Sequence, residues 1–142
     1  MLRRLIVLDA RERLLLAVSL GWVMAARVAL AGTAGSLQRT QRTLDMLCAR
    51  LPRSGAFTLD EAAWAITAAA RRVPGTRCLA WALALHGMLR HEGIFSELRI
   101  GVAKTQPDAL SAHAWVDCSG RVLSWGDRVD GYNVLHARAV ES

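Results

Sequence analysis

The sequence predicts a single α+β domain, with helices first and strands last. The chain of 142 residues is near the usual size of one domain, and its 53% apolar content is ample for a packed core. Apolar residues recur at helical spacing through the first part of the chain, and later they alternate with polar or small residues. N-terminal helices and a central cysteine-bearing helix are expected to pack on a small antiparallel sheet. Within the domain 1–142, residues 1–55 are the N-terminal helical part and residues 56–142 are the core.

The first predicted helix runs from about Ala10 to Leu30. Asp9 and Glu12 give a D-x-x-E capping pattern directly ahead of its apolar run. This apolar run could span a bilayer only if Arg27 were tolerated. The favourable insertion energy of its Leu and Val residues is nearly cancelled by the cost of Arg27 and of the Gly, Ser and Thr residues. We therefore expect a helix buried against the domain or a partner. Association with a membrane surface and a true membrane span are the alternatives.

Two further helices follow. The second is amphipathic, stops at Pro52 and carries leucines at helical spacing, namely Leu37, Leu44, Leu47 and Leu51. The third begins after Thr58, which repeats the capping-box pattern with Glu61, and it is expected to end near Val73.

The fourth predicted helix is apolar on several faces, which indicates a central position. Thr76 is its expected N-cap, and Gly93 lies just past its end. The next segment has the period of a strand, in which Leu98, Ile100 and Val102 alternate with Arg99, Gly101 and Ala103. A loop then leads to a second strand that contains the stretch SAHAWVD.

The net charge of +6 comes almost entirely from arginines that are spread along the chain and interleaved with acidic residues. A solvated basic surface is the favoured interpretation, while an acidic partner and a nucleic acid are the alternatives. The three cysteines lack a C-x-x-C pair or zinc-like spacing, so no disulfide framework and no metal site are expected. The N-terminus lacks a secretory cleavage pattern. These features predict a protein of the reducing cytoplasm.

Cys78 and His113 form the strongest candidate for chemistry. Cys78 would lie in the first turn of the central helix, where free backbone N–H groups and the helix dipole favour a thiolate. Taken singly, such a cysteine is usually a core residue, and a histidine in a strand is usually structural. Together they gain weight, because a thiolate nucleophile needs a base that later protonates the leaving group. The remaining cysteines are expected to be structural, and the other histidines to lie at the surface or at helix caps: Cys48, Cys118, His86, His91 and His136.

The third member of such a site depends on the turn that follows the histidine strand. Strand alternation places His113, Trp115 and Asp117 on one face. A three-residue loop near Gly120, the favoured alternative, would put Asp127 beside His113, where it could fix the imidazole tautomer. A two-residue loop would put Asp127 on the opposite face. Asp117 is the runner-up, because it stands about 6.6–6.8 Å along His113's own strand, beyond hydrogen-bond reach.

A resemblance to a known family rests on two stretches, TRCLAWALALHGMLRHEGIFSELRIGV and SAHAWVD, together with the Gly turn and the acid that follow. The chain resembles the lasso peptide biosynthesis B2 proteins, a branch of the transglutaminase-like and papain-like cysteine-protease fold. The resemblance covers Thr76 to Asp127, and the N-terminal DARERLLLAVSLGW is similar to the family's leading helix. It implies that Cys78 is the nucleophile, His113 the base and Asp127, aligned by eye, the third triad member. Residues 56–142 are then a transglutaminase-like catalytic core.

The resemblance also implies the reaction, a cytoplasmic cysteine peptidase that removes the leader from a ribosomally made lasso peptide precursor. The sequence has no room for the winged-helix domain of the fused family members, so a separate leader-recognition protein is implied. An ATP-using macrolactam synthetase would then close the released core. No cofactor and no nucleic-acid partner are expected. The alternatives are an acyl transferase of the transglutaminase or amidase type and a non-catalytic, membrane-associated scaffold.

Overall fold

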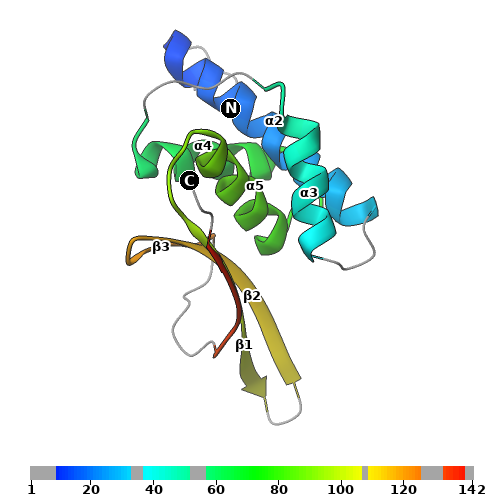
Figure 1. Cartoon of the computed structure of the whole chain (residues 1–142). Helices are drawn as coiled ribbons and strands as arrows, with labels where there is room; N and C mark the ends of the chain where they lie inside the picture. Colours follow the sequence, from blue (N-terminus) through cyan, green and yellow to red (C-terminus); the bar gives the residue numbers. More distant parts are fainter. Residues whose placement is uncertain (1–8, 33–36, 52–56, 107–108, 126–132, 140–142) are drawn as a thin grey trace.

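The computed structural model describes residues 9–32, 37–51, 57–106, 109–125 and 133–139. In this part of the chain the helices gather on one side and the sheet lies on the other (Figure 1). The elements are α2 (Ala10–Gly32), α3 (Leu37–Cys48), α4 (Leu59–Arg72), α5 (Cys78–His91), β1 (Glu97–Gln106), β2 (Ala109–Cys118), β3 (Arg121–Leu123) and β4 (Asn133–Ala139).

The sheet has the strand order β3-β2-β1-β4, and every neighbouring pair is antiparallel. Helix α5 contacts both β2 and β1, and it also contacts α2, α3 and α4. It therefore lies between the sheet and the other helices. Its residues from Ala80 to Leu89 are all buried. This arrangement confirms the predicted α+β class and the central position of the cysteine-bearing helix.

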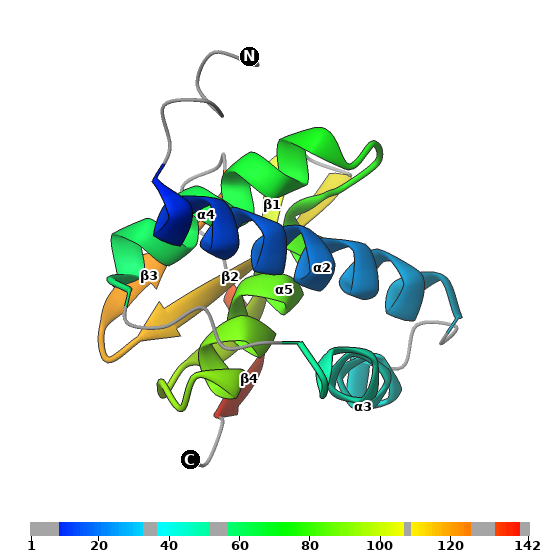
Figure 2. The same cartoon turned by 90° about the horizontal axis from the view of Figure 1, so that it is seen from above.

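Helix α2 is long and apolar enough to cross a membrane by length and composition. In the structure it packs against α3, α4 and α5, and Figure 2 shows it lying across α5. Trp22, Val23 and Ala26 on its inner face are fully buried. The helices meet closely, because a Cβ atom added to Gly87 of α5 would lie 2.6 Å from the Trp22 ring. The expected packing of this helix on the domain is confirmed.

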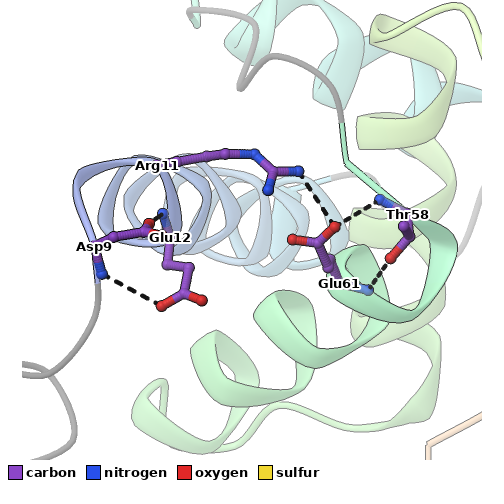
Figure 3. Close-up of polar contacts among 5 residues, drawn as sticks. All are labelled: Asp9, Arg11, Glu12, Thr58 and Glu61. Carbon is purple, nitrogen blue, oxygen red and sulfur yellow. Dashed lines mark hydrogen bonds and ion pairs between the residues drawn. The ribbon is translucent and has the colours of Figure 1, made fainter.

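Two capping boxes fix the starts of α2 and α4, as the sequence predicts (Figure 3). At α2, the Glu12 backbone N–H donates to Asp9 Oδ1 over 2.7 Å, and the Asp9 N–H donates to Glu12 Oε2 over 3.4 Å. At α4, Thr58 and Glu61 make the same reciprocal pair, each over 3.1 Å. The Arg11 guanidinium then reaches Glu61 Oε1 at 3.2 Å and joins the two helix starts.

The α4 capping box predicts a pH-dependent stability. The Thr58 N–H and, less strongly, the Arg11 guanidinium lower the pKa of Glu61 below its ordinary 4.5. A carboxyl group with a lowered folded pKa stabilises the fold above its unfolded pKa, and this stabilisation is lost as the pH falls through the folded value. Glu61→Gln is therefore expected to lower the free energy of unfolding at pH 7, but hardly at an acidic pH at which the Glu61 carboxyl group is protonated in the folded protein.

Urea unfolding of wild type and Glu61→Gln at both pH values measures this effect. Thr58→Ala is the matched variant, because it removes an uncharged cap; it is expected to cost about 1 kcal/mol at either pH. An equal loss for Glu61→Gln at both pH values would show that its charge contributes nothing.

The start of α5 differs from the prediction. Its N-cap is Arg77, which makes no side-chain capping hydrogen bond, and the helix begins at Cys78. Thr76, the expected N-cap, instead donates its hydroxyl to the Val73 carbonyl over 2.8 Å. That contact lies in the turn that ends the preceding helix, so the Thr76 hydroxyl is held away from the amides of α5.

The end of α5 follows the prediction. Gly93, with φ of +78°, lies just beyond the C-cap Glu92. The Ile94 N–H donates to the Leu89 carbonyl over 2.8 Å, and the Gly93 N–H donates to the Arg90 carbonyl over 3.0 Å. This is the Schellman motif, in which the left-handed residue is usually glycine. The reversal sends the chain from α5 directly into β1.

The hairpin between β2 and β3 has a two-residue turn. Cys118 pairs with Arg121, so only Ser119 and Gly120 lie in the turn, with φ of +53° and +91°. Two successive positive φ values are typical of the type I′ turn, whose twist matches that of the flanking strands. Asp117 Oδ1 accepts a 2.9 Å hydrogen bond from the Gly120 N–H and holds this turn. The predicted three-residue loop is therefore wrong.

The two faces of the sheet have different roles. One face joins the hydrophobic core shared with the helices, through Leu98, Ala114, Val116, Cys118 and Leu123. His113, Trp115 and Asp117 alternate with these residues along β2 and so lie on the other face. On that face His113 is opposite Gly101 of β1, a position without a side chain.

Candidate active site

Cys78 is the first residue of α5 and is half-buried. The first hydrogen bond of the helix runs from the Trp81 N–H to the Arg77 carbonyl. The amides of the first turn ahead of Trp81 therefore lack an acceptor within the helix. At α2 and α4 an Asp or Thr side chain caps these amides, whereas at α5 the N-cap side chain makes no such bond. The Cys78 thiol thus lies at an uncapped helix start, where the backbone favours negative charge.

The other two cysteines have a different environment. Cys48 is buried in the core, and burial, with a contribution from the Asp45 carboxylate, raises the pKa of its thiol to about 12. Cys118 is also buried, and burial followed by the Asp117 charge raises its thiol pKa. Both thiols are therefore protonated at neutral pH. Their expected structural role is confirmed, and Cys78 is the cysteine that solvent can reach.

His113 lies on β2 and is only 3% exposed. Its Nε2 atom is 2.7 Å from the Ser124 hydroxyl oxygen, a hydrogen-bond distance. Its ring also stacks on that of Trp115, with centroids 6.1 Å apart and planes inclined by 24°. The imidazole is therefore fixed both at one ring nitrogen and across one ring face.

The structure places Cys78 and His113 on elements that touch, because α5 packs on β2. The imidazole, however, belongs to the face of β2 that alternates with the core face. Among the described residues no hydrogen bond joins the Cys78 thiol to His113. The structure thus positions both candidates without showing them in contact, and their catalytic pairing stays a prediction.

The two candidates for the third triad member are Asp117 and Asp127, and of these the structure describes Asp117. Asp117 bonds the Gly120 N–H, and its carboxylate is 3.6 Å from the Arg99 guanidinium. These contacts serve the turn and the sheet. Asp127 lies outside the described residues. The face argument for Asp127 required the three-residue loop, which the structure contradicts, so its assignment now depends on the resemblance alone.

Sequence reasoning overlooked Ser124. With the two-residue turn, Asp117 pairs with Val122 and Val116 with Leu123. The next residue, Ser124, falls opposite Trp115 and therefore on the His113 face. The signal was present in the dipeptide Ser119-Gly120, because short polar residues followed by glycine favour two-residue turns. The two-residue register that removes the face argument for Asp127 is the one that places Ser124 on the His113 face.

Two of the other histidines, His86 and His91, are not the surface or capping residues that the sequence suggested. His86 is buried, with its Nδ1 atom 2.8 Å from the Ser96 hydroxyl. The Nε2 atom of His91 is 3.0 Å from the Leu51 carbonyl oxygen, and its ring packs on Trp22. Both connect α5 to neighbouring segments. The side chain of His136 lies outside the described part.

Comparisons with known proteins complete the description of the site. A search of curated proteins and a search of solved structures found no match. The family model of the transglutaminase-like superfamily matches residues 20–137, which run from α2 into β4. The match spans most of the chain and includes both Cys78 and His113. The Cys-bearing helix packed on a small antiparallel sheet is the expected core of that fold. The chain therefore belongs to the transglutaminase-like superfamily.

Proposed function

We propose that this protein is a cysteine peptidase that removes the leader from a ribosomally made precursor peptide, with Cys78 as its nucleophile. The observation that carries the proposal is the place of Cys78, a half-buried thiol at the uncapped start of the central helix. Enzymes of the superfamily typically use a cysteine and a histidine. His113 is the histidine that the resemblance assigns to this role.

In the proposed reaction, Cys78 Sγ attacks the scissile carbonyl carbon, and the C–N bond breaks to give a thioester. The imidazolium of His113 protonates the departing amine. Water then attacks the thioester, His113 accepts its proton, and the thiol is released with a carboxylate product. Backbone N–H groups at the start of α5 are suitable donors for the oxyanion. The pairing of Cys78 with His113 is assigned by the resemblance alone, because the imidazole belongs to the face of β2 that alternates with the core face.

The lasso peptide precursor, the separate leader-recognition protein and the macrolactam synthetase follow from the resemblance to the B2 proteins. The exposed side of α2 supports binding of a protein partner. Leu14, Met24 and Val28 on this helix are 42%, 57% and 62% exposed. Apolar side chains left in water on one helix are typical of an interaction surface. We assign this surface to the leader-recognition protein and the reaction to the cytoplasm.

Mass spectrometry of the reaction products tests the function. The purified protein is mixed with a precursor peptide and a leader-binding protein encoded beside it. Hydrolysis gives separate leader and core peptides whose masses sum to that of the precursor plus water. A transglutaminase would instead give a cross-linked product, and an amidase would release ammonia from an intact chain. Either of those products, or an unchanged precursor, would contradict the peptidase assignment.

Asp127→Asn is expected to slow precursor cleavage by about 10²-fold or more, because an amide cannot stabilise the positive charge of the imidazolium as a carboxylate does. Asp117→Asn is expected to cost much less, since the Asp117 carboxylate bonds the turn and not the imidazole. Steady-state cleavage rates of the two variants provide the measurement. Near-normal turnover of Asp127→Asn beside a crippled Asp117→Asn would reverse the assignment.

A further inference from the structure

Arginines gather around the start of α5, in parts of the chain that lack acidic residues. The sequence has no Asp or Glu from residue 13 to residue 44, or from residue 62 to residue 91. Most of α2, most of α4 and all of α5 lie within these two runs. We call the arginines nearest to the start of α5 the arginine patch, which consists of Arg27, Arg71, Arg72 and Arg77.

Helix α2 brings Arg27 to the turn between α4 and α5. At the other end of the helix pair, Arg11 near the start of α2 contacts Glu61 near the start of α4. A Cβ atom added to Gly75, in the turn after α4, would lie 2.7 Å from Arg27 Nη2. The two helices therefore run side by side in the same direction. Their acidic residues lie in their first turns, and the arginine patch lies at their far ends.

The other members of the patch come from the end of α4 and the turn that follows. Arg71 and Arg72 are in the last turn of α4, and Arg77 is the N-cap of α5, directly ahead of the proposed nucleophile. The Trp81 indole N–H donates to Thr67 Oγ1 over 3.0 Å. This bond joins the first turn of α5 to α4 one turn before Arg71, so the end of α4 is held beside the start of α5.

The positive charge of the patch is not neutralised within the part of the chain that the structure describes. None of its guanidinium groups makes an ion pair there. Arg27, Arg71 and Arg77 are exposed, and Arg72 donates to the Ala68 carbonyl over 2.8 Å, which leaves its charge in place. The C-terminal end of α4 favours the cations Arg71 and Arg72, whereas the N-terminal end of α5 disfavours Arg77. An anion bound at the patch would relieve this repulsion.

We propose that the arginine patch binds an acidic side chain of the substrate, within a few residues of the scissile bond. The inference rests on the proposed function, in which Cys78 attacks that bond. Because Arg77 adjoins Cys78, a peptide that presents its carbonyl group to the thiol passes the patch. A guanidinium group binds a carboxylate through two parallel hydrogen bonds, which adds direction to the attraction between the charges. A Glu or Asp side chain is therefore the group that this surface selects.

Alkylation of Cys78 measures the patch without any precursor. Iodoacetate and iodoacetamide react with the same thiolate, but iodoacetate is an anion and iodoacetamide is neutral. The ratio of their rates at Cys78, followed by mass spectrometry of the modified peptide, reports attraction by nearby positive charge and cancels the reactivity of the thiol. Arg77→Gln is expected to lower this ratio about threefold, the effect of one charge at about 7 Å in water. Added NaCl is expected to lower it as well.

Arg50→Gln is the matched control, since it removes the same charge from an exposed residue next to Leu51. The Leu51 carbonyl contacts His91, the last residue of α5, which is about 20 Å along the helix from Cys78. The ratio is expected to stay at the wild-type value in this variant. An unchanged ratio in Arg77→Gln, or an equal fall in Arg50→Gln, would overturn the proposal.

Cleavage of paired precursor peptides tests the substrate preference. The two members of a pair carry Glu or Gln at one position, and the pairs cover the residues on both sides of the scissile bond. At one position or more, wild type is expected to cleave the Glu member about threefold more efficiently, through a lower KM. Arg77→Gln is expected to lose this preference, and Arg50→Gln to keep it.

A preference for Glu at no position, or one that survives in Arg77→Gln, would overturn the proposal. Sedimentation of wild type with phosphatidylglycerol vesicles, in place of a Glu preference, would identify the patch as a membrane-binding surface instead. If wild type cleaves no member of any pair, the proposed function fails. The alkylation ratio then decides by itself whether the patch attracts anions to Cys78.

Discussion

Cys78→Ala is expected to abolish precursor cleavage, with the rate falling at least about 10³-fold, because no thioester can form. The structure makes this prediction specific to one cysteine. Cys78 is half-buried at an uncapped helix start, whereas Cys48 and Cys118 are buried with raised thiol pKa values. The measurement is the rate of leader release by purified variants, with circular dichroism to establish that each is folded.

Cys48→Ala and Cys118→Ala are the matched controls, and both are expected to keep turnover if they fold. Iodoacetamide at neutral pH is expected to modify Cys78 ahead of the other two cysteines and to remove activity in step with that modification. Leader release by Cys78→Ala at the wild-type rate would favour the non-catalytic scaffold. Loss of activity while Cys78 stays unmodified would show that another group is essential.

His113→Gln is expected to lower kcat by about 10²- to 10⁴-fold, the usual contribution of general acid–base catalysis. The glutamine fills a similar space but cannot exchange a proton with the thiol or the leaving amine. Among the described residues the structure shows no hydrogen bond between Cys78 and His113. The activity of this variant is therefore the test of their catalytic pairing.

His86→Gln is a close control for that experiment. His86 is likewise buried and bonded to a serine hydroxyl, with Nδ1 2.8 Å from Ser96 Oγ, but it lies in the middle of α5. Equal losses in the two variants would indicate a shared effect on folding. A large loss in His113→Gln alone supports the catalytic role, and normal turnover of that variant rules His113 out as the base.

Local signals in the sequence determined much of the fold. Helical spacing of apolar residues located α2, α3, α4 and α5 to within a few residues. Capping patterns marked the starts of α2 and α4, and Gly93 marked the end of α5. These predictions succeeded because each depends on residues within one turn, where the side chain and the backbone group that it bonds are fixed by their spacing.

Tertiary structure decided the parts of the site that join distant residues. The Thr76 hydroxyl could accept from the amides of α5 or donate to a nearby carbonyl. In the structure it donates to the Val73 carbonyl in the turn after α4, and α5 begins uncapped at Cys78. The strand period put His113 and Trp115 on one face but could not choose the length of the turn.

The sequence by itself therefore determined the order of helices and strands, the helix that carries Cys78 and the face that His113 shares. The packed sheet determined which residue meets the imidazole. Every side chain of a returning strand changes face when its register shifts by one residue. The two-residue turn at Ser119 and Gly120 brought Ser124 to His113 Nε2, because it pairs Cys118 with Arg121.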